Sequence, residues 1–158
     1  MSFSPVYTAD SRVLILGTWP SPKSRAQGFY YGHPQNRFWP LLAALLNEEA
    51  PCELSAKKAL IERHSLALWD TVASCTITGA RDATIRDVVP NDIAALCRLA
   101  PIQRVLCNGA VSYRLYQRYQ TGGVPALLMP STSPANAAWG MERLKGTWGA
   151  ALQREGIH

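Results

Sequence analysis

The sequence predicts an α/β fold, a three-layer α/β/α sandwich around a four-stranded parallel sheet. Four short apolar runs are typical of strands that are covered on both faces. Amphipathic helical patterns lie between these runs, and alternating strands and helices favour right-handed crossovers onto a parallel sheet. The chain shows no internal repeat and no linker long enough to divide it, so we expect residues 1–158 to form one domain.

The first expected strand covers residues 12–17 and contains the run Val13-Leu14-Ile15-Leu16. The other three expected strands are residues 66–69, 102–107 and 124–129. The last one begins with Val-Pro, which favours an edge of the sheet because proline cannot donate to the ladder. The order of the strands does not follow from the pattern.

Five helices are expected. Apolar residues of the first follow the i, i+3, i+4, i+7, i+8 spacing of an amphipathic helix, namely Phe38, Leu41, Leu42, Leu45 and Leu46. Asn36 is expected to cap it, and Pro40 is tolerated in its first turn. Ser55 is expected to cap a helix that runs to about residue 64, and Asn91 is expected to cap another. A fourth helix follows Gly109, and a fifth covers roughly residues 141–154.

Composition narrows the classes of function. Charged residues make up 17%, and five Trp and six Tyr are present, which excludes a disordered acidic or basic tail protein. The net charge of +5 permits a polyanionic partner without requiring one. No run approaches the roughly 18 apolar residues of a membrane span, and the first residues lack a basic start before an apolar stretch. We therefore expect a soluble, cytoplasmic protein with no membrane partner.

Several common chemistries lack their sequence signatures. The four cysteines never form a CxxC pair, so we expect them to be reduced and packed as small apolar residues. The three histidines show no metal-ligand spacing, and we expect neither a metal nor another cofactor. The motifs GxSxG, GxxxxGK[ST] and GxGxxG are all absent. What remains at the candidate site is rich in Asn, Ser, Thr and aromatic residues.

Unusual segments follow three of the expected strands. They are GTWPSP at residues 17–22, NGA at 108–110 and PSTSPAN at 130–136. Because carboxyl ends of parallel strands meet at one edge of the sheet, these loops are expected to open together. Hydroxyls and backbone amides near a helix start can hold a phosphate, although local capping by Ser and Thr is an equally good interpretation of each loop alone.

A cluster of aromatic and amide side chains precedes the first helix, in the segment FYYGHPQNRFW at residues 29–39. Such a mixture can stack on a planar ring and hydrogen-bond its edge. Core packing is the better interpretation for Phe38. For Tyr30, Tyr31 and His33 a role in binding is favoured.

Five strings in order resemble the hypoxanthine-DNA glycosylases, the family-six branch of the uracil-DNA glycosylase superfamily. They are LGTWPS at residues 16–21, YYGHPQNRFW at 30–39, ALWDTVASC at 67–75, CNGA at 107–110 and MPSTSPANA at 129–137. The resemblance implies removal of a deaminated base, chiefly hypoxanthine, with xanthine or uracil possible. It also implies a four-stranded parallel sheet, which agrees with the fold expected from the pattern.

The resemblance implies that two asparagines are catalytic. Most of the superfamily carries Asn or Asp after the first strand, but that loop here reads GTWPS. The hypoxanthine branch is thought to use instead the Asn of HPxN, which is Asn36, with Asn108 of the NG motif as a second contributor. An amide does not ionise near neutral pH, so Asn36 either orients a water or donates to the base.

The chemistry of base removal agrees with this set of residues. The target base must be extruded from the stack, and a base that pairs poorly costs less to extrude. It then leaves as an anion, which hydrogen-bond donors stabilise. Schiff-base catalysis needs an amine at the sugar, and the motif blocks contain no lysine, although Lys23 follows in the first loop. We expect a monofunctional enzyme that leaves an abasic site.

Roles for the remaining residues follow from the match and the chemistry. Trp19 or Tyr30 is expected to stack on the base. The whole base pocket is expected to contain Gly17, Thr18, Trp19, Tyr30, Tyr31, His33 and Asp70. DNA is expected to be held by Ser21, Ser131, Thr132, Ser133, Pro134 and Asn136. The DNA would be double- or single-stranded, and the protein a monomer.

One segment departs from the family pattern, and two other functions stay open. The family usually carries a basic residue and Gly-Ser ahead of an Asp where this chain reads TITGARD at residues 76–82. If Arg81 or Asp82 lies near the DNA, the accepted bases could differ. The alternatives are a nucleic-acid-binding domain that has lost catalysis and a hydrolase of a small nucleoside-like metabolite, since fold alone does not determine function.

Overall fold

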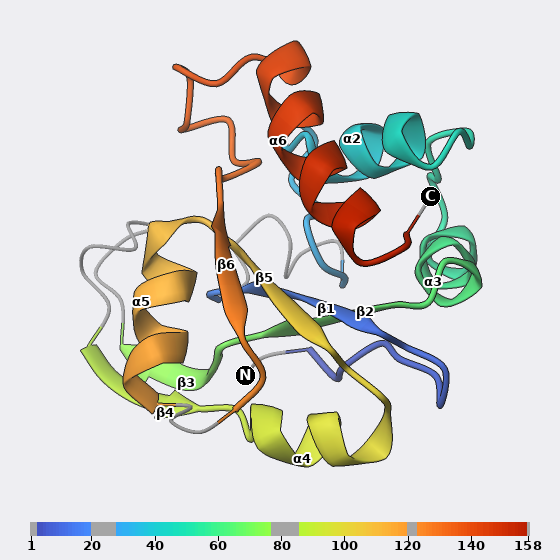
Figure 1. Cartoon of the computed structure of the whole chain (residues 1–158). Coiled ribbons are helices and arrows are strands. Elements are labelled where there is room, and N and C mark those ends of the chain that lie inside the picture. The colour runs from blue at the N-terminus through green and yellow to red at the C-terminus, as the bar shows by residue number, and fades with distance from the viewer. Residues whose placement is uncertain (1–2, 20–27, 77–85, 120–122, 158) are drawn as a thin grey trace.

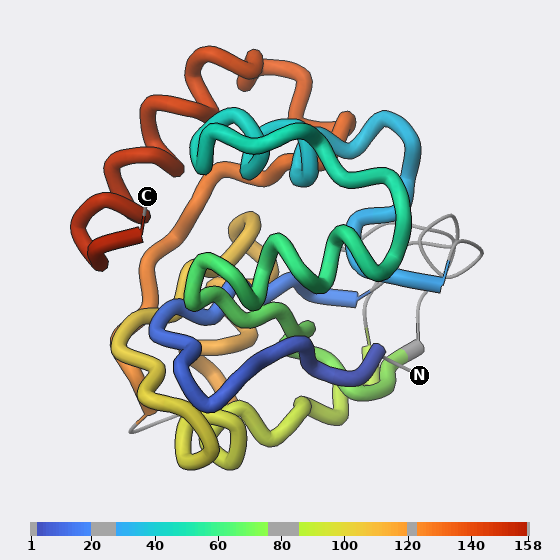
Figure 2. Tube along the Cα trace, turned by 90° about the vertical axis from the view of Figure 1, so that its right-hand side faces the viewer, coloured from blue at the N-terminus to red at the C-terminus, as the bar shows by residue number. Residues whose placement is uncertain are grey.

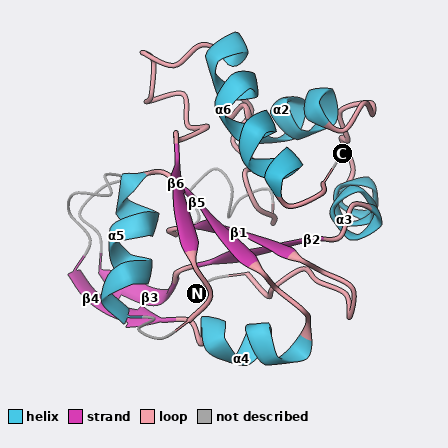
Figure 3. Ribbon diagram, viewed as in Figure 1, coloured by secondary structure: helices cyan, strands magenta, loops and turns pink. Residues whose placement is uncertain are grey.

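Four parallel strands form the central sheet of this computed structural model, which describes residues 3–19, 28–76, 86–119 and 123–157. The strands are β1 (Val13–Gly17), β2 (Leu66–Asp70), β5 (Arg104–Asn108) and β6 (Ala126–Met129). Their order is β2-β1-β5-β6, and every neighbouring pair is parallel (Figure 1, Figure 3). All four expected strands are therefore confirmed, and β6 lies at an edge, as the Val-Pro pair just before it indicated.

Side chains of β1 alternate between two cores, because successive residues of a strand point to opposite faces of the sheet. Val13 and Ile15 pack in the core under α2 (Phe38–Leu45), α3 (Leu54–Arg63) and α6 (Met141–Arg154). Leu14 and Leu16 pack in the core under α4 (Ile93–Leu99) and α5 (Ala110–Tyr119). Figure 2 shows α2 and α6 on one side of the sheet and α4 on the other, which confirms the three-layer sandwich.

The starts of α2 and α3 differ from expectation by one or two residues. Arg37 rather than Asn36 is the N-cap of α2, although Asn36 Oδ1 accepts a hydrogen bond from Phe38 N–H at 2.9 Å. The N-cap of α3 is Glu53, so Ser55 lies inside the first turn instead of capping it.

None of the helices in the described residues has the length and apolar character of a membrane span.

The start of α4 is tied to the end of β2. Its N-cap is Asp92, whose side chain accepts from Ala95 N–H at 3.1 Å, and not Asn91 as expected. Asn91 instead donates its side-chain amide to the backbone carbonyl of Asp70 at 2.8 Å. A residue type typical of caps is used here to hold the edge of the sheet where the candidate site lies.

Two strands outside the main sheet were not expected. β3 (Val72–Thr76) and β4 (Arg86–Pro90) form an antiparallel pair with irregular register. Neither segment has the clean apolar run or alternation by which strands are found from sequence. The pair begins just past β2, where Thr71 N–H donates to the Gly17 carbonyl at 2.8 Å and Val72 N–H donates to the Thr18 carbonyl at 3.1 Å. These bonds fix the turn that follows β1.

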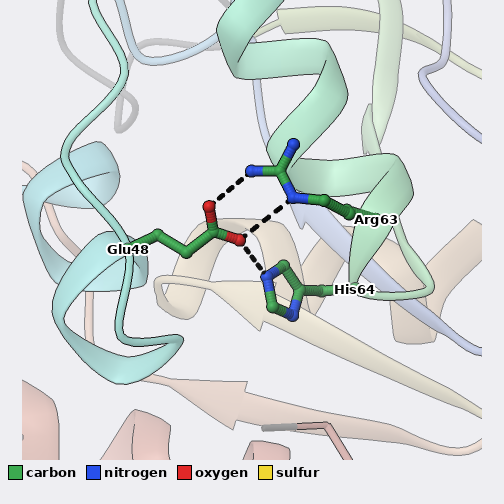
Figure 4. A network of polar contacts seen from close by, with 3 residues as sticks. All are labelled: Glu48, Arg63 and His64. Carbon is green, nitrogen blue, oxygen red and sulfur yellow. Dashed lines mark hydrogen bonds and ion pairs between the residues drawn. The ribbon is translucent and has the colours of Figure 1, made fainter.

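A charged cluster joins the end of α2 to the end of α3. Glu48 follows α2 and accepts from both Arg63 and His64 (Figure 4). Two nitrogens of the Arg63 guanidinium, Nε and Nη2, each donate to one oxygen of the carboxylate, which is a bidentate pair. Because α3 leads into the amino end of β2, this cluster lies at the end of the sheet opposite the loops that follow the strands.

Candidate active site

The carboxyl ends of the strands bring predicted site residues to one edge of the sheet. Gly17 ends β1 and lies in register with Asp70 at the end of β2. Asn108 ends β5 and lies in register with Met129 at the end of β6. The loop of residues 130–139, which we call the Pro-Ser loop, follows β6. Ligands of open α/β sheets bind at this edge, which makes it the candidate active site.

Thr132 of the Pro-Ser loop joins the two asparagines that are expected to be catalytic. Its hydroxyl donates to Asn36 Oδ1 at 2.8 Å and accepts from Asn108 Nδ2 at 3.0 Å. Its backbone N–H donates to Asn108 Oδ1 at 3.0 Å. Thr132 is 0% exposed, so it cannot touch a phosphate, and its expected role in holding DNA is corrected.

Arg37 holds the Pro-Ser loop through four backbone carbonyls. Its backbone N–H and Nε donate to the Thr132 carbonyl at 3.1 and 3.4 Å. Its Nη2 donates to the carbonyls of Ser133 and Asn136 at 2.9 and 3.2 Å, and its Nη1 donates to the carbonyl of Trp139. A guanidinium presents five donors in a rigid fork, so one side chain can order a loop that contains neither helix nor strand.

The side chains of the Pro-Ser loop also bond within the loop. Ser131 Oγ accepts from Ser133 N–H, and Ser133 Oγ accepts from Ala135 N–H, both at 3.1 Å. Asn136 Nδ2 donates to the Ser131 carbonyl at 3.0 Å, and Pro134 is partly exposed. The local capping that the sequence allowed is therefore present. A hydroxyl that accepts in this way still carries its own proton, which can be donated to a ligand.

Asp70 and Tyr31 meet over the end of β1. A methyl group on Gly17 would lie 2.5 Å from Asp70 Oδ1 and 3.0 Å from the Tyr31 hydroxyl, so this position requires glycine. Asp70 is 4% exposed. Among the described residues, neither its Oδ2 nor the Tyr31 hydroxyl has a hydrogen-bond partner.

Burial dominates the protonation of this pair. It raises the pKa of Asp70 to about 7, so the neutral acid is a major form near neutral pH. Burial, and after it the charge of Asp70, also raises the pKa of Tyr31, while the nearby side chain of Asn108 acts in the opposite direction. The phenol therefore stays protonated throughout the physiological range.

Tyr30 lies in the core, which corrects its expected place in the base pocket. It is 2% exposed, and its hydroxyl donates to the backbone carbonyls of Phe3 and Ser4 at 3.1 and 2.7 Å. Its ring packs edge-on against Phe29 at 5.2 Å between centroids. Because the ring is already covered, Tyr30 cannot stack on an extruded base.

The other expected pocket residues lie near the edge of the sheet with different local roles. Thr18 is 9% exposed, and Trp19 beside it is partly exposed. The Tyr31 ring stacks on Phe38 at 4.0 Å between centroids. His33 Nδ1 accepts from the backbone N–H two residues later at 3.0 Å, which is a local turn. The expected DNA contact Ser21 lies outside the described residues, as do Lys23, Arg81 and Asp82.

A cavity of about 630 Å³ opens between the end of β6, the start of α5 and the Pro-Ser loop. Its wall includes Ser131, Ser133 and Asn136, three of the residues expected to hold DNA. Trp139 also lines it, and the Arg143 guanidinium lies 3.9 Å over the Trp139 ring. The cavity is adjacent to the asparagine pair, because Gly109 in its wall follows Asn108 directly.

Sequence reasoning missed Arg37 and the linking role of Thr132. The available signal for Arg37 was its position next to Asn36, together with a loop rich in Ser, Pro and Asn that needs donors from elsewhere. For Thr132 no local signal distinguishes it from its serine neighbours. In the described part of the chain, no group of three or more His, Cys, Asp or Glu is arranged to hold a metal ion.

The site offers amide and hydroxyl groups and a carboxyl that burial favours as the neutral acid. Such groups can bind a flipped base and stabilise charge on a leaving group, and the amides and hydroxyls among them do not act as bases near neutral pH. Together with a four-stranded α/β/α sheet that carries an asparagine pair at its carboxyl edge, they fit the chemistry of a DNA N-glycosylase.

Comparison with known proteins confirms the resemblance. The family model of the uracil DNA glycosylase superfamily matches residues 4–152, and the chain belongs to this superfamily. A protein of Methanosarcina barkeri named hypoxanthine DNA glycosylase is 30% identical over 154 residues, which cover 96% of this chain and 97% of the relative. A protein of Methanosarcina acetivorans with the same name is 29% identical over 153 residues, or 96% of each chain.

A solved structure agrees with this assignment. The solution NMR structure of a candidate uracil DNA glycosylase from Methanosarcina acetivorans superposes with a TM-score of 0.85 at 26% sequence identity. The superposition covers 98% of this chain and 97% of that one. The fold and the family are therefore shared along nearly the whole chain.

Proposed function

We propose that this enzyme removes deaminated bases from DNA, hypoxanthine first, and leaves an abasic site. The observation that carries the proposal is the pair of asparagines that Thr132 joins at the carboxyl edge of the sheet. The five motifs, the names of two relatives and the superfamily support the same activity. Xanthine and uracil are further candidates, because each shares with hypoxanthine an N–H next to a carbonyl. The enzyme would act as a monomer on cytoplasmic DNA.

In the proposed reaction the N-glycosidic bond breaks and its electron pair leaves with the base. The oxygen of a water molecule bonds to C1′ of the sugar, and the proton that this water loses ends on the departing base. Asn36 and Asn108 would meet the extruded nucleotide, and amide donors stabilise the charge that develops on the base. Asp70, Tyr31 and the backbone at Gly17 would form the inner end of the pocket.

The Pro-Ser loop would hold the DNA backbone. Ser131 and Ser133 keep hydroxyl protons that can be donated to phosphate oxygens. Pro134 and Asn136 would lie near the gap that the flipped nucleotide leaves. Arg143, stacked on Trp139 at the end of the loop, adds a cation next to these groups.

Labelled oligonucleotides test the proposal. Duplexes and single strands carrying hypoxanthine, xanthine or uracil are incubated with the protein and then treated with alkali. We expect cleavage at hypoxanthine that requires the alkali step. Asn36→Ala should lower the rate by about 100-fold or more, the effect of losing one strong donor to a developing charge. Gln35→Ala is a matched control, because Gln35 is the exposed neighbour of Asn36.

The remaining outcomes separate the other functions. Binding of lesion DNA with no cleavage of any base would favour a binding domain. Activity on free nucleosides with none on DNA would favour a hydrolase of small metabolites. Strand cleavage without alkali would contradict the monofunctional mechanism, since it needs an amine that attacks the sugar.

A further inference from the structure

The Thr132 hydroxyl is committed to the two asparagines. It is fully buried, it donates to Asn36 Oδ1 at 2.8 Å, and it accepts from Asn108 Nδ2 at 3.0 Å. Its backbone N–H closes a second bond to Asn108 Oδ1, so that asparagine is held at both ends of its amide. A buried hydroxyl that both donates and accepts a hydrogen bond within the protein holds its partners in place and is not available to a ligand.

The acceptor side of Asn36 is also fully used. Its Oδ1 receives the Phe38 backbone N–H at 2.9 Å as well as the Thr132 hydroxyl at 2.8 Å, and a carbonyl oxygen has two lone pairs. A backbone N–H can only donate, so this bond also determines which end of the amide is oxygen. Within the described residues no hydrogen bond uses Asn36 Nδ2, and Asn36 is partly exposed.

The bonds run in one direction along the chain of groups. The Asn108 amide donates to the Thr132 hydroxyl, which donates to the Asn36 carbonyl. Hydrogen bonds in such a chain polarise one another, by roughly 10–30% per bond in condensed-phase estimates. Electron density drawn toward Asn36 Oδ1 leaves its N–H groups more positive and therefore better donors.

We infer that Thr132 is a positioning residue which locks Asn36 with its amide N–H groups toward the substrate. The inference rests on the proposed glycosylase function and assigns Asn36 the part of a hydrogen-bond donor rather than that of an acceptor. A carbonyl oxygen that is already saturated cannot accept a proton from the attacking water. Asn36 therefore acts as a donor, either to the departing base as it takes the electron pair or to the oxygen of the water.

Three variants test the inference in the full-length protein. Thr132→Val replaces the hydroxyl with a methyl group of similar shape, Thr132→Ser keeps the hydroxyl, and Thr8→Val is a control in the turn before β1. Single-turnover cleavage of hypoxanthine duplex at rising enzyme concentration separates the rate of chemistry from half-saturation. For Thr132→Val we expect the rate to fall 10- to 100-fold with half-saturation changed less than 3-fold, about the effect of one misplaced catalytic group. Thr132→Ser should stay within about 5-fold of the native rate.

A double-mutant cycle asks whether Thr132 acts through Asn36. In an Asn36→Ala background, Thr132→Val should lower the rate less than about 2-fold, because its target is already gone. A merely structural role would instead lower the rate by the same factor in both backgrounds. Weaker binding with unchanged single-turnover rate would overturn the inference and restore a role in holding DNA.

A measurement without substrate keeps the inference separate from the proposed function. The side-chain amide of Asn36 is followed by NMR relaxation in the native protein and in both Thr132 variants. We expect a rigid amide in the native protein and in Thr132→Ser, and a mobile one in Thr132→Val. An equally rigid amide in all three would refute the inference even if the enzyme cleaves DNA. Absence of cleavage at every lesion by the native protein, with the NMR result as expected, would refute the proposed function alone.

Discussion

Replacing Asp70 with Asn should change how stability depends on pH. Burial raises the pKa of this carboxyl from its usual 3.8 to about 7. Each pKa unit corresponds to about 1.4 kcal/mol, so the difference between the two values is worth about 4 kcal/mol. The pKa is higher in the folded than in the unfolded protein, so the protonated carboxyl stabilises the fold relative to the ionised one. This stabilisation is complete below about pH 4 and is lost as the pH rises through 7.

The native protein and Asp70→Asn are compared by urea unfolding at pH 5, 6, 7 and 8. Asparagine has the same shape and never ionises, so the difference between the two proteins isolates the buried carboxyl. Between pH 5 and pH 8 the free energy of unfolding of the native protein should fall by about 3 kcal/mol relative to Asp70→Asn. Asp10→Asn, at an exposed turn, is the matched control and should show no such trend.

A difference between native and Asp70→Asn that stays within about 0.5 kcal/mol from pH 5 to pH 8 would refute the reasoning. It would mean that the carboxylate is ionised in the folded protein with hydrogen-bond partners that offset its burial. The expected result would instead show that the strand edge carries an acid which weakens the fold at neutral pH. Costs of this kind are common at functional sites, where a group is kept for its chemistry.

Three further predictions concern positions that the structure singles out. Arg37→Met removes the side-chain donors from four loop carbonyls, so we expect faster hydrogen exchange over residues 132–139. The free energy of unfolding should fall by about 2–4 kcal/mol, whereas Arg114→Met, at an exposed position, should change neither quantity. Gly17→Ala places a methyl group 2.5 Å from an Asp70 carboxylate oxygen, so the free energy of unfolding measured in denaturant should fall by about 1–3 kcal/mol. Gly146→Ala, in open space on α6, should raise it by about 0.5–1 kcal/mol. Hydrogen bonds from Arg63, and to a smaller extent from His64, lower the pKa of Glu48. The ionised carboxylate therefore stabilises the fold at neutral pH, and this stabilisation is lost as the pH falls through the pKa of the folded protein. Thermal unfolding should therefore separate Glu48→Gln from the native protein at pH 7 but not at strongly acidic pH, and equal separation at both would contradict this assignment.

Much of the site could be located from sequence because its loops follow strands with strong apolar runs. Asn36 and Asn108 were found through the motifs that contain them, and the structure brings both to one edge of the sheet. Tyr30 and Thr132 were misassigned, although each lies inside a motif. Both side chains are buried. The type of a residue and its neighbours in the sequence do not tell whether a tyrosine or threonine is buried or exposed.

The four strands of the parallel sheet and the positions of the loops could be predicted from the amino-acid sequence alone, because hydrophobic periodicity and turn chemistry are local properties of the chain. The family could be predicted because its motifs are short local strings. The contacts of the site residues follow only from the tertiary structure. The bond between Thr132 and Asn36 joins residues 96 positions apart, and that between Arg37 and the Trp139 carbonyl spans 102. A side chain's partner at such a separation depends on how the layers pack. Packing is also what buries Asp70 and leaves its Oδ2 without a partner among the described residues.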